Sequence, residues 1–381
     1  MRITIVMGFF LPVPPVAGGA TEKIWFRLAR EFAAAGHAVT LVSRRWPGCP
    51  SRETIDGITM IRVRGFDHTR RLPLNLLFDG LWGLRLLRHL PPADLTICNT
   101  VSLPVYVRLL RPATGRTAAV LGRMPKGQVR AYGCVDLLLA PSAGVAACAR
   151  AENPRLGGRI RVFPNPIDWD LHARSSGKAP YPTIGYIGRI HPEKGLEILL
   201  EAAARLATDA TLPPWRLEIR GPVEIAQGGG GTDYRDSLLA MYGSRLGARL
   251  QFQPPEYDAT RLAACYGAMD VFCYPSIAER GETFGIAVAE AMAAGAVPVV
   301  SGLAVFHDLV TSGQNGLVFD HRSGDAAGSL ASALARLMAD PPLRAALAAR
   351  AQADARRYDF AEAARNLLDQ FARLTPATTQ R

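Results

Sequence analysis

Two glutamates, Glu282 and Glu290, flank seven residues in a segment that reads ETFGIAVAE. A short apolar strand is predicted over 271–274, a polar loop follows it, and residues 284–294 have a helical pattern that ends at Gly295. Glu282 then precedes the helix and Glu290 lies two turns inside it. Free backbone N–H groups and the positive end of the dipole make a helix N-terminus a site for phosphate. We therefore predict a diphosphate here, with one carboxylate near a sugar and the other near a ribose.

Two cations occupy a second junction between a strand and a helix. The segment 185–195 reads GYIGRIHPEKG, with Gly188 at the end of a predicted strand and Arg189 and Lys194 in the loop that follows. Both side chains can bind a phosphate placed in the crevice at the strand ends. A solvated surface pair is the alternative, and charge alone does not separate the two interpretations.

Alternating strands and helices surround these residues. Before a connector at 164–168, short apolar strands are predicted over 2–7, 38–43, 58–64, 94–98, 118–121 and 136–140, with a helix over 22–35. After it, strands are predicted over 183–188, 216–220, 250–252, 271–274 and 297–300, with a helix over 194–206. This rhythm is typical of parallel sheets covered on both faces.

We therefore predict an α/β fold of two doubly wound, Rossmann-like domains that face each other across a cleft. The predicted domains are 1–165 and 166–357, and the second carries the predicted diphosphate site. The end of the chain, 358–381, is predicted to form a helix that packs back on the first domain. The glycine run at 228–231 is predicted to be a flexible loop, because no strand leads directly into it.

The composition narrows the functional classes. The 381 residues carry a formal charge of +11, which favours anionic partners, although a genome-wide bias towards arginine also explains the excess. Nucleic acid is not expected as a partner, because no zinc-finger spacing or RNA-binding signature is present. Dinucleotide-binding, P-loop, zinc-hydrolase and serine-hydrolase motifs are absent as well.

The cysteines and the N-terminal residues predict a cytoplasmic protein. The six cysteines form no C-x-x-C pair, which is typical of a reduced compartment. The first twenty residues carry one charge, Arg2, and three prolines interrupt them, so a strand and loop are expected there rather than a signal peptide. No apolar run reaches the length of about 20 residues that spans a membrane.

Four landmarks in this order give the chain a resemblance to a known family. They are the Gly18-Gly19 loop, the connector Pro164-Asn165-Pro166-Ile167-Asp168, the turn Gly188-Arg189 to Gly195, and the pair Glu282 and Glu290. The chain resembles the retaining glycosyltransferase family four, whose two-lobed fold is called GT-B. The resemblance covers nearly the whole chain.

The resemblance implies that a hexose is transferred from a nucleoside-diphosphate sugar bound by domain 166–357 to an acceptor bound by domain 1–165, with no cofactor. No metal ion is expected either, because Arg189, Lys194 and a helix terminus can neutralise the diphosphate. Arg189 and Lys194 would hold the diphosphate, and fixed cations of this kind stabilise the negative charge as it leaves. Glu282 would face the donor sugar and Glu290 the ribose. The remaining donor-binding residues would be Gly19, Gly188, Thr283, Phe284 and Gly285, with the N–H groups of Gly19, Phe284 and Gly285 on phosphate.

The sequence departs from the family in the first domain. Relatives carry a histidine near the reacting carbon, but residues 121–126 read LGRMPK, so the role of Arg123 or Lys126 there is open. The connector has Pro166 where glycine is usual. Asp168-Trp169-Asp170 has the form of a metal-binding motif, but it follows two prolines rather than a strand, and a turn capped by Asp168 is the favoured interpretation.

Several alternatives stay open. A nucleotide-sugar epimerase of the same fold, or a binding protein without turnover, would use the same donor. The acceptor is unidentified and can be a glycan, a lipid-linked sugar or a small metabolite. Residues 70–90 mix basic ends with Leu, Phe and Trp, which suits either an amphipathic helix packed on the first sheet or a helix at the inner face of an anionic membrane.

Overall fold

The computed structural model describes residues 1–174, 177–178 and 180–374. The chain divides into two compact units. The first unit combines Met1–Pro166 with the described chain from Phe360 onward, and the second is Ile167–Asp359. Residues 375–381 of the predicted terminal helix lie outside the described residues.

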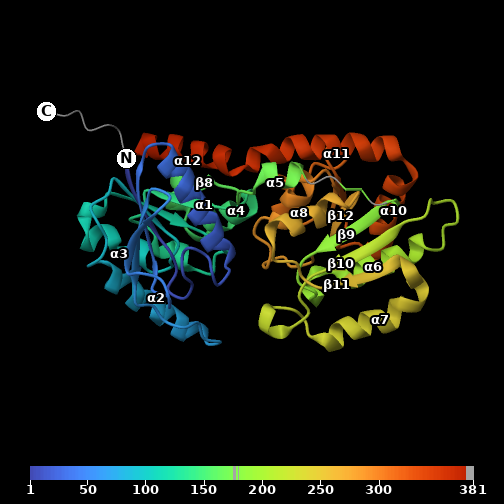
Figure 1. Ribbon diagram of the computed structural model, residues 1–381, viewed down its shortest axis with the longest axis horizontal. Coiled ribbons are helices and arrows are strands. Elements are labelled where there is room, and N and C mark those ends of the chain that lie inside the picture. Colours follow the sequence, from blue (N-terminus) through green and yellow to red (C-terminus); the bar gives the residue numbers. More distant parts are fainter. Residues whose placement is uncertain (175–176, 179, 375–381) are drawn as a thin grey trace. The chain divides into compact units, whose positions relative to one another are not determined.

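The first unit is built on an eight-stranded sheet, blue to green in Figure 1. Its order is β3-β4-β2-β1-β5-β6-β7-β8, and only β3 runs antiparallel to its neighbour. The strands are β1 (Arg2–Val6), β2 (Ala38–Arg44), β3 (Arg52–Ile55), β4 (Ile58–Val63), β5 (Leu95–Cys98), β6 (Arg116–Val120), β7 (Leu137–Ala140) and β8 (Ile160–Val162). Without β3 and β8, the chain order of the strands is 3-2-1-4-5-6, the doubly wound Rossmann arrangement.

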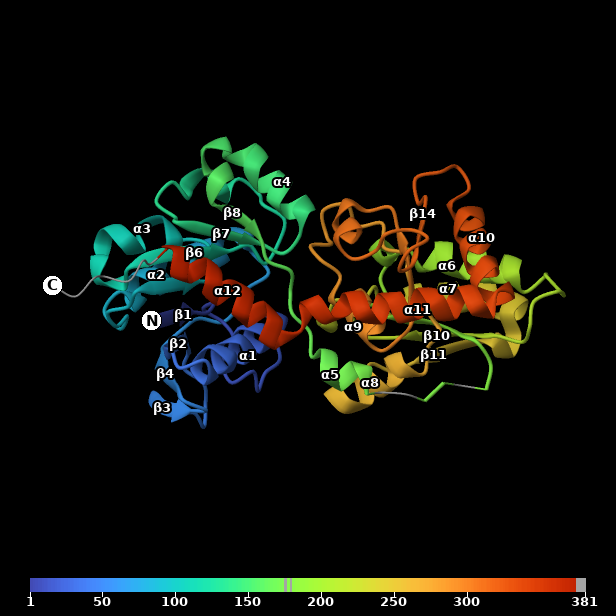
Figure 2. The same cartoon turned by 90° about the horizontal axis from the view of Figure 1, so that it is seen from above.

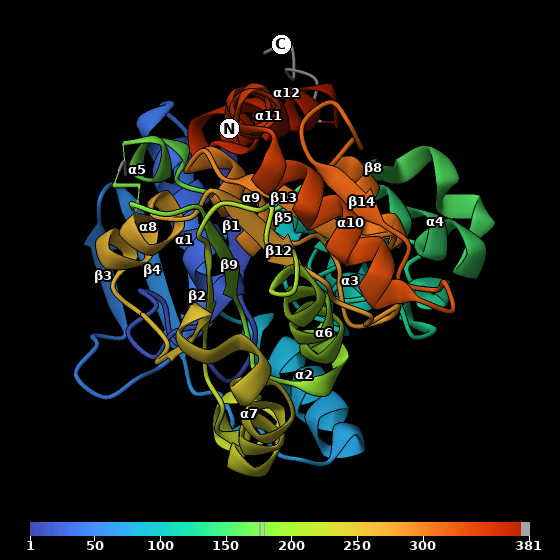
Figure 3. The same ribbon diagram turned by 90° about the vertical axis from the view of Figure 1, so that its right-hand side faces the viewer.

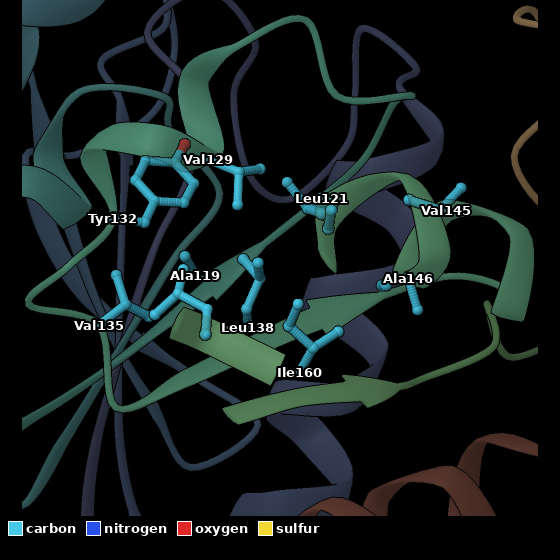
Figure 4. Close-up of a cluster of buried hydrophobic side chains, with 12 residues drawn as sticks. Ala119, Leu121, Val129, Tyr132, Val135, Leu138, Val145, Ala146 and Ile160 are labelled. Atoms are coloured by element: carbon cyan, nitrogen blue, oxygen red, sulfur yellow. The ribbon is translucent and has the colours of Figure 1, made fainter. Parts of the chain in front are cut away.

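Helices cover this sheet because its strands are apolar on both faces. They are α1 (Ala20–Ala34), α2 (Leu72–Leu86), α3 (Leu103–Leu110), α4 (Ala143–Glu152) and α12 (Phe360–Leu374). The cluster in Figure 4 shows such packing, where Leu138 and Ile160 of the sheet meet Val145 and Ala146 of α4. The terminal helix α12 lies beside α1 (Figure 2), with the rings of Phe32 and Phe371 6.2 Å apart.

The second unit contains a six-stranded parallel sheet in the order β11-β10-β9-β12-β13-β14. Its strands are β9 (Thr183–Ile187), β10 (Arg216–Arg220), β11 (Leu250–Gln253), β12 (Val271–Tyr274), β13 (Val297–Ser301) and β14 (Leu317–Phe319). In chain order this is again 3-2-1-4-5-6, so the α/β prediction of two Rossmann-like units is confirmed.

Two groups of helices accompany the second sheet. The helices are α5 (Trp169–Ala173), α6 (Leu196–Leu206), α7 (Thr232–Leu246), α8 (Ala259–Gly267), α9 (Ile286–Ala293), α10 (Ala326–Ala339) and α11 (Pro341–Ala355). Helix α6 packs against α7 and α10 (Figure 3), whereas α9 packs against α5, α8 and α11. None of the described helices is long and apolar enough to cross a membrane.

The structure corrects several local predictions. Strands β3, β8 and β14 were not predicted. Helix α9 begins at Ile286 rather than at residue 284, which places Glu290 about one turn inside it instead of two. Helix α6 begins at Leu196, after the 3₁₀ turn Pro192–Lys194, so Lys194 lies in the turn before the helix.

Candidate functional site

The topology of the second unit places the predicted site residues together. The strand order reverses between β9 and β12, and ligands of open α/β sheets bind at the carboxyl ends of strands at such a switch point. Arg189 follows β9 after one glycine, and the loop with Glu282 follows β12. Residues that are far apart in the sequence therefore meet at one edge of the sheet.

Lys194 and Glu282 form a buried ion pair at this edge. The Lys194 ammonium contacts Oε1 of Glu282, and the hydroxyl of Ser276 donates to the same oxygen at 2.8 Å. Lys194 is 4% exposed and Glu282 is 7% exposed. The ammonium also lies 5.6 Å from the centroid of the Tyr274 ring. This lysine therefore orients the carboxylate that was predicted to face the donor sugar.

Arg189 is the more accessible cation. Its side chain is 41% exposed, and its Nη2 lies 2.5 Å from Oε1 of Glu193. Its Nη1 donates to the carbonyl of Gly228 at 3.0 Å. The guanidinium is thus held in place but open on one side.

The glycine run beside Arg189, which was predicted to be a flexible loop, forms a turn held by backbone hydrogen bonds. The four residues of 228–231 each donate a backbone N–H to a carbonyl; those of Gly230 and Gly231 reach Ile190 at 2.8 Å and Val223 at 2.9 Å. A Cβ on Gly229 would overlap the carbonyl of Val223. The run can approach Arg189 closely because it lacks side chains.

Glycine is also required at Gly188, between β9 and Arg189. A Cβ there would lie 2.6 Å from the Tyr186 hydroxyl, which donates to the Arg189 carbonyl at 2.8 Å. The buried tyrosine therefore fixes the backbone that carries the arginine.

The N-terminus of α9 offers donors to an anion. Gly285 is the N-cap residue, with a φ of 104° that favours glycine, and no side chain caps the helix. Within the described residues, the backbone N–H groups of Phe284 and Gly285 have no acceptor. Phe284 is buried and its ring packs 5.3 Å from that of Tyr358, while Thr283 before it is half-buried. The helix terminus therefore has two N–H donors available for the predicted phosphate.

Glu290 contacts a separate set of polar side chains, those of Tyr266 and His172. The Tyr266 hydroxyl hydrogen-bonds to its carboxylate, and Nε2 of His172 lies 3.8 Å from its Oε1. Burial and the neighbouring carboxylate raise the pKa of Tyr266 well above its usual value. The sequence analysis missed both neighbours, because no spacing links them to Glu290.

In the first unit, a carboxylate lies beside Gly19, the residue whose N–H was predicted to bind phosphate. Gly19 is the N-cap residue of α1 with a φ of 96°, and a Cβ on it would overlap the carboxylate of Glu22. Burial raises the pKa of Glu22. An anion bound by the Gly19 N–H therefore needs this side chain either protonated or turned away.

The other residues considered in the sequence lie in an exposed loop and at the start of α5. Arg123 and Lys126 are exposed in the loop after β6. Asp168 caps α5 by accepting the Leu171 N–H at 3.2 Å, as the turn interpretation predicted, and exposed Asp170 pairs with Arg174 at 3.8 Å. The described residues contain no group of three or more His, Cys, Asp or Glu that could hold a metal ion.

Two family models match the chain over most of its length. "Glycosyltransferase Family 4" matches residues 18–171 and "Glycosyl transferases group 1" matches residues 168–354. Together with the two Rossmann-like units and the site at the β9 and β12 ends, these matches define a glycosyltransferase of the GT-B fold.

Relatives and solved structures agree with this class. The chain is 32% identical over 380 residues to the phosphatidyl-myo-inositol mannosyltransferase of Mycolicibacterium smegmatis, covering 94% of this chain and 90% of that protein. It is 34% identical over 214 residues, 55% of its own length, to the D-inositol 3-phosphate glycosyltransferase of Rhodococcus opacus, of which it spans only 45%. The chain belongs to glycosyltransferase family four.

Solved structures show the same fold at low identity. Sucrose-phosphate synthase from Thermosynechococcus elongatus superposes with a TM-score of 0.78 at 21% identity, over 99% of this chain and 100% of that one. HepE from Anabaena, in complex with UDP and glucose, superposes with a TM-score of 0.69 at 18% identity, over 98% and 99% of the two chains.

Proposed function

We propose that this glycosyltransferase moves a hexose from a nucleoside-diphosphate sugar to an acceptor with retention of the anomeric configuration, and that it needs no metal ion. The bond between the anomeric carbon and the diphosphate breaks, and the acceptor oxygen bonds to the same face of the sugar. The nucleoside diphosphate leaves with the bonding electron pair, so negative charge grows on its phosphates.

The observation that carries this proposal is the open donor set at the switch point of the second unit. The free N–H groups of Phe284 and Gly285 and the exposed guanidinium of Arg189 all follow neighbouring strands. Preorganised donors of this kind stabilise a developing charge without reorganising during the reaction. Gly188 and Thr283 shape the backbone beside them.

Lys194 acts through Glu282 in this proposal as well as on the phosphate. The ammonium holds the carboxylate by direct contact, and Ser276 fixes the same oxygen. The Tyr274 hydroxyl also hydrogen-bonds to Glu282, and the carboxylate fixed in this way faces the hydroxyl groups of the donor sugar. Glu290 binds the ribose at the other end of α9.

Sugar transfer is favoured over the two alternatives, a nucleotide-sugar epimerase and a binding protein without turnover. The relatives described above are glycosyltransferases by name and none is an epimerase. A binding protein without turnover has no use for donors placed against the leaving diphosphate. The same placement supports metal independence, because one guanidinium, one ammonium and a helix terminus can supply the positive charge that a divalent ion otherwise supplies.

The test is a thermal-shift panel of UDP-, GDP- and ADP-hexoses in EDTA, since a ligand specific for the native state raises its stability. The stabilising donor is then incubated with phosphatidylinositol vesicles, inositol phosphate or an oligosaccharide, and the product anomer is assigned by NMR. We expect nucleoside diphosphate release that depends on one acceptor. A donor converted to its epimer without any acceptor would contradict the proposal.

We also propose that α2 brings the protein to an anionic membrane, where the acceptor is carried by a lipid. One face of α2 is anchored to the first unit, because Trp82 donates to the Met7 carbonyl at 3.1 Å and Asp79 accepts the Ser102 N–H at 2.7 Å. The rest of the helix exposes leucines that we call the α2 leucine surface: Leu72, Leu74, Leu76, Leu77, Leu81 and Leu84.

Basic residues flank the α2 leucine surface. Arg70, Arg71 and Arg88 are exposed at the two ends of the helix. An exposed apolar patch with a basic rim suits the interface of an anionic bilayer. The name of the mycobacterial relative, a phosphatidyl-myo-inositol mannosyltransferase, supports a lipid acceptor.

Vesicle sedimentation tests this surface. The protein should bind vesicles that contain phosphatidylglycerol and release at high salt. Leu77→Glu should weaken binding at least tenfold, since burying one leucine contributes about 1.5 to 3 kcal/mol. Leu239→Glu is the matched control, because Leu239 is an exposed leucine on α7. Equal vesicle binding by both variants would contradict the membrane role.

A further inference from the structure

A buried histidine lies next to the carboxylate that is proposed to bind the ribose. His172 belongs to α5, the short helix capped by Asp168, which packs against α8 and α9. The side chain is enclosed, with 4% of the residue exposed. Neither the proposed transfer nor the family landmarks give this residue a role.

His172 and Tyr266 reach Glu290 from two different helices. The Tyr266 hydroxyl, from α8, donates a hydrogen bond to the carboxylate. Nε2 of His172, from α5, lies 3.8 Å from Oε1, which is too long for a hydrogen bond but leaves the ring dipole directly beside the carboxylate. The Glu290 side chain is 21% exposed, so part of it is accessible to solvent.

Packing alone does not explain an imidazole at this position. The ring meets Tyr266 edge to face, with centroids 5.5 Å apart and an interplanar angle of 70°, an arrangement that a phenyl ring makes equally well. The second nitrogen, Nδ1, is buried and has no hydrogen-bond partner among the described residues. A buried polar atom without a partner costs free energy, and such an atom calls for an explanation.

We propose that His172 and Tyr266 are positioning residues that hold Glu290 in the orientation that binds the ribose hydroxyls, and so make the donor site selective for ribonucleotides. The inference rests on the proposed function, because it needs a nucleotide in this site. With its proton on Nε2, the imidazole turns the positive end of its dipole towards the carboxylate, and Nδ1 carries the lone pair.

The charge state of the ring fits this role. Burial lowers the pKa of His172 to about 4, so the imidazole is neutral at pH 7. A neutral ring orients the carboxylate without cancelling its charge. In this proposal the carboxylate of Glu290 remains the acceptor for the ribose hydroxyl groups.

The test compares ribose with 2′-deoxyribose in the same site. Calorimetry is run with UDP, GDP and ADP and with the 2′-deoxy form of whichever binds. The wild type should prefer the ribonucleotide at least tenfold, because one hydrogen bond to a charged group contributes about 1.5 kcal/mol or more. His172→Phe and Tyr266→Phe should each reduce the preference to about threefold or less. His172→Gln, which restores an N–H near the position of Nε2, should recover part of it.

Two controls separate positioning from folding. His89→Phe and Tyr257→Phe make the same changes at exposed residues and should keep the full preference. His172→Phe removes the unpaired nitrogen, so its thermal stability should equal or exceed that of the wild type at pH 7.

The outcomes distinguish the two proposals. A wild type that binds none of the three nucleotides would overturn the proposed function itself. A wild type that prefers ribose, with His172→Phe and Tyr266→Phe retaining that preference, would overturn this inference and leave the proposed function standing.

Discussion

Removing the Lys194 ammonium should destabilise the second unit, because Glu282 would keep a buried charge with no partner. Breaking a buried ion pair on one side costs about 3 to 5 kcal/mol. Glu282 is 7% exposed, so water cannot replace the ammonium easily, but the hydrogen bond from Ser276 at 2.8 Å remains. We therefore expect Lys194→Met to lower the free energy of unfolding by about 3 kcal/mol, at the lower end of that range.

Urea unfolding followed by circular dichroism and tryptophan fluorescence measures this loss. Each unit contains tryptophans, Trp82 in the first and Trp215 in the second, so their transitions can be compared. The double variant Lys194→Met with Glu282→Gln removes both charges and should recover most of the stability. Arg205→Met, at an ion pair whose arginine side chain is 41% exposed, should change much less and is the matched control.

Two results would refute the reasoning. Lys194→Met within about 0.5 kcal/mol of the wild type would show that the pair is not buried as the structure has it. A double variant no more stable than Lys194→Met would show that the loss does not come from an uncompensated carboxylate.

Three further predictions concern the same unit. Arg189→Ala should weaken nucleotide binding at least tenfold by calorimetry, since a charge-assisted contact contributes about 1.5 to 3 kcal/mol; unchanged affinity would contradict its role. Glu282→Gln should lose turnover yet bind free nucleoside diphosphate, whereas Glu290→Gln should lose both, and equal binding losses would refute the division. Burial lowers the pKa of His172 in the folded chain to about 4, although the charge of Asp168 opposes this shift. Between the usual pKa of 6.5 and pH 4, the unfolded chain therefore binds a proton that the folded chain does not. Its stabilising contribution is present above pH 6.5 and falls by about 2 to 3 kcal/mol towards pH 4; His172→Phe should flatten this part of the unfolding profile, and an unchanged profile would contradict the assignment.

The core strands could be predicted because both of their faces are buried. The strand Val271–Tyr274 is a continuous apolar run, and such runs carry a signal that does not depend on the partner strand. Strand β3, Arg52–Ile55, reads RETI and joins β4 through a two-residue turn at Asp56 and Gly57. An edge strand with alternating polar residues has no such run, and so it was missed.

The site could be predicted in part for a topological reason. Lys194 and Glu282 are 88 residues apart, but each follows one of two strands that lie side by side, so a doubly wound sheet brings their segments together. No such topological rule predicts the contact of His172 with Glu290. It depends on how α5, α8 and α9 pack, and periodicity in the sequence does not encode that packing.

Calorimetry of the full chain with UDP, GDP and ADP in excess EDTA tests the central claim most directly. The account predicts saturable binding of at least one nucleotide to a single site, with the affinity lowered at least tenfold in Arg189→Ala and kept in Glu282→Gln. Binding that appears only after Mg²⁺ or Mn²⁺ is added, or the same affinity in Arg189→Ala as in the wild type, would contradict it.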